Sequence, residues 1–359
     1  MRIEAIAAIF TSRIISNEDI LKMISTESQE SFQGDLKGSR ALHRVSQLLQ
    51  YSGIKYRRWS LPNETPIQLL AQAISKALAE GGCGLADIDL LVYTGVGGGF
   101  CEPGNSYMVA HALGMKHTQC FDIRDACNSW LRALQLIHHT FEADRSFSRA
   151  LVVNAEFNMY WGGPGVPDLF RLQHVEDIYS CFPAYTIGEA ATATLLAKDS
   201  RREWEFHFAS RTDLADLCMI PEINYKGYCV IGLDGQRDIS CERIGRNGAY
   251  RFTSFGSELS AQGTIPAIDV FRRLSIAPDS IHKIFPHASS KRDWDNGADI
   301  LGVKHLLFHI YPDYGNVVSA SVPAAIALAK EKGEVRPGDR LVAWVGSAGM
   351  SFSVCSFLL

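Results

Sequence analysis

The sequence predicts an α/β protein in which helices cover mixed β-sheets. Helix-like and strand-like segments alternate along most of its 359 residues, which is the pattern of such folds. The chain also repeats itself loosely at an offset of about 190 residues, as duplicated folds do. Its composition is that of an ordinary globular protein, with 47% hydrophobic and 21% charged residues. The length allows two domains or one large duplicated domain.

Apolar spacing predicts the elements of the first half. Residues 66–80 are expected to form a helix, because Ile67, Leu70, Ile74 and Leu78 recur at helical spacing. Short apolar runs and helix-stop signals predict the remaining elements: strands at 90–94, 151–155 and 191–196, and a helix at 106–113 that ends before Gly114.

The second half continues the alternation. A long helix is expected at 257–274, interrupted at Pro266. The elements predicted after it are strands at 281–285, 340–345 and 351–357, and a helix at 319–330. The stretch 157–186 is rich in Gly, Pro and aromatic residues and predicts a long functional loop. Residues 201–250 lack a clear pattern and are interpreted as a cap.

Three pairs of segments support the internal repeat. They are 86–94 with 278–287, 149–154 with 339–344, and 121–136 with 311–326. We therefore divide the chain into an N-terminal half, residues 1–199, and a C-terminal half, residues 200–359. The third pair aligns Cys127 with Asn316.

Charge and cysteine usage exclude several classes of function. The net charge of −4 gives no general basic field for nucleic acid. The nine cysteines are scattered and odd in number, which favours reduced thiols and a cytoplasmic location. No apolar run has the length of a membrane helix, and the N-terminus lacks the layout of a signal peptide. Metal-ligand spacing is also absent, so no metal is expected.

Cys127 is the most informative residue of the chain. It follows a short apolar strand and a tight turn, and a helix is expected to begin at it. Unpaired N–H groups and the helix dipole would favour the nucleophilic thiolate there. A cysteine alone is more often an inert core residue. The interpretation changes because His287 follows a predicted strand and Asn316 precedes a predicted helix. In a pseudo-two-fold arrangement, such element ends converge.

This trio has a consistent chemistry. A thiolate at Cys127 can attack an acyl thioester and hold the acyl group. His287 and Asn316 can donate hydrogen bonds to an enolate or oxyanion. The small-residue loop 346–349 precedes the last strand, and its backbone N–H groups can form an oxyanion hole together with that of Cys127.

The motifs resemble those of β-ketoacyl-acyl-carrier-protein synthase III, within the thiolase-like condensing enzymes. The resemblance lies in residues 52–58, 62–65, 121–127, 285–288 and 315–323 and spans nearly the whole chain. It implies a five-layer α-β-α-β-α fold built from two pseudo-two-fold related halves, a dimer, and no metal or redox cofactor. It assigns the catalytic roles to Cys127, His287 and Asn316, and the oxyanion amides to Cys127 and Ala348.

Departures from the family's motifs indicate a specialised member. The family usually has Cys-Ala/Ser-Gly-Phe, whereas this chain has Cys127-Asn-Ser-Trp130, which changes the crowding at the thiol. The tryptophan that stacks on the adenine of coenzyme A is replaced by Gln47, and the arginine beside it by Tyr51. Arg292 keeps the place of an arginine that contacts phosphate. We expect Arg292, Trp130 and Gly349 to bind the substrate or its carrier.

The leading hypothesis is decarboxylative Claisen condensation through acyl-Cys127, in polyketide, other secondary-metabolite or fatty-acid-like biosynthesis. The alternative is acyl transfer from Cys127 to an alcohol or amine, with His287 as the general base. A third hypothesis is a non-catalytic subunit of a heterodimeric complex. The expected partners are acyl-coenzyme A or acyl carrier protein and a second copy of the chain, with a related subunit in a heterodimer as the alternative to that second copy. Neither a membrane nor a nucleic acid is expected as a partner.

Overall fold

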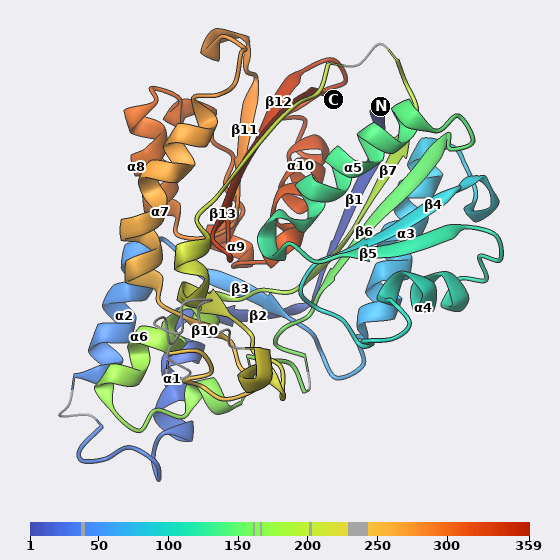
Figure 1. Ribbon diagram of the computed structural model, residues 1–359. Helices are drawn as coiled ribbons and strands as arrows, with labels where there is room; N and C mark the ends of the chain where they lie inside the picture. The colour runs from blue at the N-terminus through green and yellow to red at the C-terminus, as the bar shows by residue number, and fades with distance from the viewer. Residues whose placement is uncertain (37–39, 161, 166, 201–202, 229–242) are drawn as a thin grey trace.

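The computed structural model describes all residues except 37–39, 161, 166, 201–202 and 229–242. Two large sheets form its frame (Figure 1). The first sheet has the strand order β1 (Arg2–Phe10), β7 (Ala190–Ala197), β6 (Arg149–Glu156), β4 (Leu90–Thr94) and β5 (Gln119–Ile123). The second has the order β8 (Glu205–Ser210), β13 (Ser351–Leu358), β12 (Arg340–Ser347) and β11 (Lys283–Pro286).

Corresponding strands of the two sheets pair in the same sense. In the first sheet, β1, β7 and β6 pair antiparallel, and β6 pairs parallel with β4. In the second, β8, β13 and β12 pair antiparallel, and β12 pairs parallel with β11. The described strands of the first sheet lie between residues 2 and 197, and those of the second between 205 and 358. The boundary between residues 199 and 200 stays a prediction.

Helices form the other three layers, as Figure 1 shows. The central layer between the sheets holds α5 (Ser129–Ala143) and α10 (Ser321–Glu331). One outer layer covers the first sheet with α3 (Pro66–Gly81) and α4 (Asn105–Ala112). The other covers the second sheet with α7 (Gly256–Phe271) and α8 (Lys291–Ile300). The five-layer α-β-α-β-α arrangement is therefore confirmed.

Smaller elements surround this frame. They are α1 (Asn17–Glu27), α2 (Ala41–Ser52), α6 (Ile178–Cys181), α9 (Tyr311–Tyr314) and the strand pairs β2 (Arg13–Ser16) with β3 (Tyr56–Trp59) and β9 (Cys218–Met219) with β10 (Thr253–Ser254). No helix in the described part of the chain has both the length and the apolar character needed to span a membrane.

Local signals explain most element boundaries. Helix α3 begins where predicted, because Thr65 caps it by accepting the Gln68 N–H and Pro66 occupies its first turn. Helix α7 differs from the prediction, since it runs through Pro266 without a break. Strand β8 lies in the stretch that sequence patterns left unassigned, and residues 229–242 of that stretch lie outside the described residues.

The two halves each place a short 3₁₀ turn before a central helix. These turns are η2 (Ala126–Asn128), which leads into α5, and η10 (Val318–Ala320), which leads into α10. Each begins at a residue with positive φ, 45° at Ala126 and 49° at Val318. Matching the turns makes Ser319, and not Asn316, the structural counterpart of Cys127. The sequence repeat was thus misaligned by three residues in this segment (319 against 316).

Candidate active site

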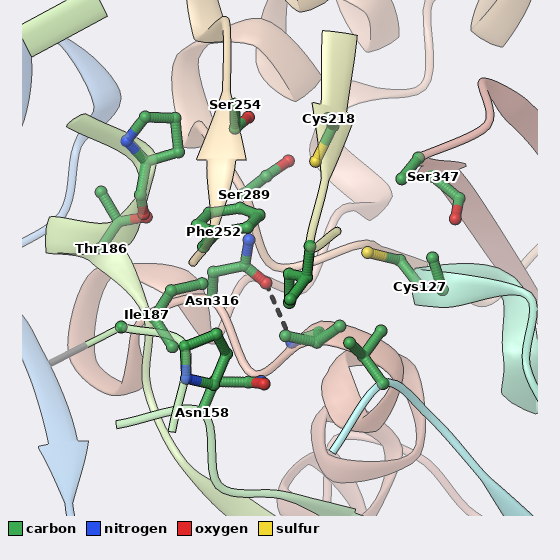
Figure 2. Close-up of a pocket in the computed structure, with 18 of the residues that line it drawn as sticks. Cys127, Asn158, Thr186, Ile187, Cys218, Phe252, Ser254, Ser289, Asn316 and Ser347 are labelled. Carbon is green, nitrogen blue, oxygen red and sulfur yellow. Dashed lines mark hydrogen bonds between the residues drawn. The ribbon is translucent and has the colours of Figure 1, made fainter. Parts of the chain in front are cut away.

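One cavity of about 1630 Å³ receives residues from both halves of the chain. Cys127, His287, Asn316 and Ala348 all line it, although they lie far apart in the sequence. Figure 2 shows the Cys127 sulfur and the Asn316 amide directed into the cavity from different sides. The structure therefore brings together the predicted nucleophile, the two predicted donors and the predicted second oxyanion amide.

Cys127 occupies the middle of the 3₁₀ turn and is not the first residue of the helix. Helix α5 begins at Ser129. The turn is held locally, because the Ser129 hydroxyl accepts the Asp125 N–H at 2.8 Å and donates to the Ala126 carbonyl at 2.7 Å. Arg132 Nε donates to the Asp125 carboxylate at 3.1 Å. The charges flanking the turn thus support its conformation.

The thiol of Cys127 is not the preformed thiolate that the sequence predicted. Burial raises the pKa of Cys127 well above its usual range, and the nearby Cys218 and Glu156 raise it further. The Ser347 hydroxyl and the Ala348 N–H, within hydrogen-bonding reach of the sulfur, act in the opposite direction. Desolvation outweighs these hydrogen bonds, so the raised pKa favours the neutral thiol in the resting protein.

His287 follows β11 and is held by its backbone N–H, which donates to the Trp344 carbonyl at 2.9 Å. Burial lowers the pKa of His287 to about 4, so its imidazole is neutral at neutral pH. Nδ1 is buried and has no hydrogen-bond partner among the described residues. An unpaired acceptor is less costly there than an unpaired N–H group, which favours the tautomer with its proton on Nε2. That tautomer can donate into the cavity.

Asn316 is positioned by a bend after α9. Gly315 has a φ of 77°, and a Cβ atom there would lie 2.6 Å from the Thr186 carbonyl oxygen and 2.7 Å from Arg57 Cβ. Only glycine fits both the conformation and the space. The Asn316 N–H donates to the Thr186 carbonyl at 2.8 Å, and its Oδ1 accepts the Val318 N–H at 2.9 Å (Figure 2). Its Nδ2 group therefore remains as the donor toward the cavity.

Comparison with known proteins agrees with this arrangement. Residues 271–358 match the family model described as 3-oxoacyl-[acyl-carrier-protein (ACP)] synthase III C terminal. The 3-oxopimeloyl-[acyl-carrier-protein] synthase of Brucella abortus is 25% identical over 305 residues, covering 84% of this chain and 86% of that protein. The β-ketoacyl-[acyl-carrier-protein] synthase III of Clostridium perfringens is 26% identical over 313 residues, covering 83% and 85%.

The chain is thus similar to β-ketoacyl-[acyl-carrier-protein] synthase III proteins over more than four fifths of its length. Solved structures show that it has the thiolase fold of this group. A cysteine-to-serine variant of Xanthomonas campestris OleA with bound lauric acid and lauroyl-CoA superposes with a TM-score of 0.77 at 19% identity, covering 99% of this chain and 98% of that one. The 3-oxoacyl-[acyl-carrier-protein] synthase III of Aquifex aeolicus superposes with a TM-score of 0.77 at 18% identity, covering 100% of this chain and 99% of that one. At family level these similarities support acyl-thioester condensation.

The three predicted binding residues lie away from the cavity wall. The Trp130 indole is buried in the core, and its Nε1 donates to Thr194 Oγ1 at 3.0 Å, so it packs behind the thiol and does not contact the cavity. Gly349 is exposed in the β12–β13 turn. Arg292 is exposed at the start of α8, and its Cζ atom lies 4.4 Å from the centroid of the Tyr51 ring. Tyr51 itself lines the cavity. Arg292 thus lies beside the cavity, with its guanidinium on one of the lining residues.

One cavity-lining residue and one buried carboxylate that acts on the Cys127 thiol were not found from the sequence. Cys218 of β9 faces the cavity (Figure 2), and burial raises its pKa to about 11. It falls in the segment without a clear pattern, so no signal pointed to it. Glu156 ends β6, is fully buried and accepts hydrogen bonds from Val96, Gly97 and Ser319. A carboxylate directly after an apolar strand was a usable signal.

Proposed function

We propose that this protein forms a carbon–carbon bond by decarboxylative Claisen condensation through an acyl-Cys127 intermediate. The observation that carries the proposal is the meeting of a thiol, two side-chain donors and a backbone donor in one cavity. Such a set can bind an acyl group covalently and stabilise an enolate beside it.

The first step is acylation of Cys127. Its sulfur attacks the carbonyl carbon of an acyl thioester, and the oxyanion accepts hydrogen bonds from the Cys127 and Ala348 amides. The carbon–sulfur bond to the carrier then breaks, and the proton of the Cys127 thiol leaves with the departing carrier thiol. No net charge is created in the buried site, which suits a thiol whose pKa is raised by burial.

The second step is condensation. A malonyl-type thioester loses CO₂, and the resulting enolate oxygen accepts hydrogen bonds from His287 Nε2 and Asn316 Nδ2. The enolate carbon attacks the acyl-Cys127 carbonyl and forms the new carbon–carbon bond. The bond from this carbonyl carbon to sulfur then breaks, and Cys127 leaves as a thiolate that takes one proton from water. A neutral donor at His287 favours condensation over acyl transfer, because a base with a pKa of about 4 is weak for an alcohol or amine.

The cavity supports a long acyl substrate. Its volume of about 1630 Å³ exceeds the usual 300–1,000 Å³ of small-molecule sites. Apolar side chains line it beneath both outer helix layers, including Leu70 and Val109 on one side and Ile268 and Phe352 on the other. The relative crystallised with lauric acid and lauroyl-CoA binds acyl groups of this kind.

Several finer points belong to the same proposal. The carrier is coenzyme A or an acyl carrier protein, as the names of the relatives suggest. We further propose that the protein uses no metal or redox cofactor and acts as a homodimer in the cytoplasm. A specialised pathway, such as polyketide synthesis, fits its departures from the family's motifs.

The test follows CO₂ release from a labelled malonyl thioester after Cys127 has been loaded from a panel of acyl donors. Acyl-dependent release that is lost in Cys127→Ala is the expected result. Acylation of Cys127 without CO₂ release would refute condensation with malonyl extenders and turn the search to alcohol or amine acceptors. Activity unaffected by Cys127→Ala would refute the acyl-Cys127 intermediate altogether.

A further inference from the structure

We propose that Asn128 is a positioning residue that holds the Cys127 thiol against the oxyanion amide of Ala348. The proposal rests on the function proposed above and adds a residue to it. The side chain of Asn128 is fully buried, lies next to the nucleophile in sequence and does not line the cavity. Its role is therefore indirect, through the turn that carries Cys127.

Every side-chain hydrogen bond of Asn128 crosses from the first half of the chain to the second. Nδ2 donates to Ser351 Oγ at 2.7 Å, and Oδ1 accepts from Ser353 Oγ at 2.5 Å. Its backbone N–H also donates to Ser347 Oγ at 3.3 Å. These partners lie 219 to 225 residues away in sequence.

The partners are the two ends of one hairpin. Ser347 and Ser351 face each other in the β12–β13 register, and Ala348 lies in the turn between them. Asn128 therefore holds both sides of the turn that presents the Ala348 amide. The Ser347 hydroxyl also donates to the Asp125 carbonyl at 3.2 Å, which ties the same hairpin to the residue before Ala126. The turn that carries Cys127 and the turn that carries Ala348 are thus fixed to each other.

An amide side chain suits this position. One Asn128 atom donates to a hydroxyl while the other accepts from a hydroxyl, and a carboxamide provides both without a charge. Buried hydrogen bonds that are fully paired rigidify their surroundings, whereas a half-paired set is costly.

The corresponding turn of the second half is held by a similar set of hydrogen bonds between the two halves, but it carries no nucleophile. Asn154 of β6 donates to Ser319 Oγ at 2.8 Å and accepts from Thr192 Oγ1 at 2.9 Å. Ser319 is the structural counterpart of Cys127, as described above. Each 3₁₀ turn is thus bound through a buried asparagine to the sheet of the other half, and on one side that asparagine adjoins the reactive thiol.

The experiment compares two reactions of Cys127 in the full-length protein. Iodoacetamide alkylation, followed by peptide mass spectrometry across a pH series, reports the thiol pKa and needs no oxyanion hole. Acylation by lauroyl-CoA, followed by mass spectrometry of the intact protein, needs both a reactive thiol and the oxyanion hole. The variants are Asn128→Ala and Ser353→Ala, with Thr194→Val as the matched control because it removes the buried bond to the neighbouring Trp130.

In Asn128→Ala we expect the alkylation profile to move to higher pH, because Ser347 and Ala348 no longer stay against the sulfur. We expect the acylation rate to fall at least tenfold more than the alkylation rate, since losing an oxyanion donor costs about 10²–10³-fold. Ser353→Ala should show the same pattern more weakly, and Thr194→Val should match the wild type.

An unchanged profile and acylation rate in a destabilised Asn128→Ala would show that the residue is only structural and overturn the proposal. If Asn128→Ala does not fold, Ser353→Ala decides in the same way. If wild-type Cys127 is never acylated, the proposed function fails, while the alkylation profiles still test the clamp.

Discussion

Lowering the pH should destabilise this protein through His287, by an amount that follows from burial. The pKa of the folded-state imidazole is about 4, whereas its ordinary value is 6.5. Between these values the unfolded chain binds a proton that the folded chain does not. The contribution of the neutral His287 to the free energy of unfolding is therefore complete above pH 6.5 and is lost as the pH falls toward 4.

The magnitude follows from the difference in pKa. One pKa unit corresponds to about 1.4 kcal/mol, so His287 should cost about 2 kcal/mol at pH 5 and about 3 kcal/mol at pH 4. The substitution His287→Ala removes this pH-dependent cost, while all other titratable groups remain. The free-energy difference between wild type and His287→Ala should thus shift by these amounts as the pH falls.

The assay is urea unfolding followed by tryptophan fluorescence at pH 7, 6, 5 and 4, for the wild type, His287→Ala and Asn316→Ala. Asn316→Ala is the control, because it alters the same cavity without removing a titrating group, and it should keep the pH dependence of the wild type. A difference between wild type and His287→Ala that stays constant from pH 7 to 4 would refute a buried neutral imidazole. The argument for a donor at Nε2 would then fail with it.

Three further substitutions test the site. Asn316→Ala should still form acyl-Cys127 but lower CO₂ release from a malonyl thioester by about 10²-fold, because one enolate donor is lost; equal losses in both steps would contradict this role. Arg292→Ala should raise KM for the acyl thioester severalfold without changing kcat, in steady-state assays at low salt, and an unchanged KM would exclude it from carrier binding. Gly297→Val should disfavour the longest acyl chains by about 0.8 kcal/mol per methylene excluded. A Cβ at Gly297 already meets the cavity-lining Trp344 at 3.3 Å, and competition between acyl-CoA lengths would show no shift if this region is unused.

Much of the fold could be predicted from the sequence, because the signals are local. Apolar periodicity located α3, and the Thr65 cap with Pro66 set its start. Continuous apolar runs located β6, β7, β12 and β13 to within two residues at each end. Strand β8 is an edge strand that was missed although Phe206 and Phe208 alternate with polar residues, which was a usable signal.

The nucleophile segment and its two donors could also be found from the sequence, because each lies at the end of an element with a recognisable motif. Trp130 shows the limit of such motifs. Its position beside Cys127 suggested a contact with substrate, yet helical geometry turns the indole into the core, where it bonds to Thr194. Neighbours in sequence at the start of a helix point in different directions.

The sequence by itself determined the layered α/β fold, the resemblance to condensing enzymes and the identity of the groups that can react, since these follow from local spacing and short motifs. Only the tertiary structure decided their state. The neutral thiol of Cys127, the neutral imidazole of His287 and the clamp at Asn128 all depend on desolvation and on partners from the other half of the chain. Burial and long-range contacts are set by how the two halves pack, and no local pattern encodes them.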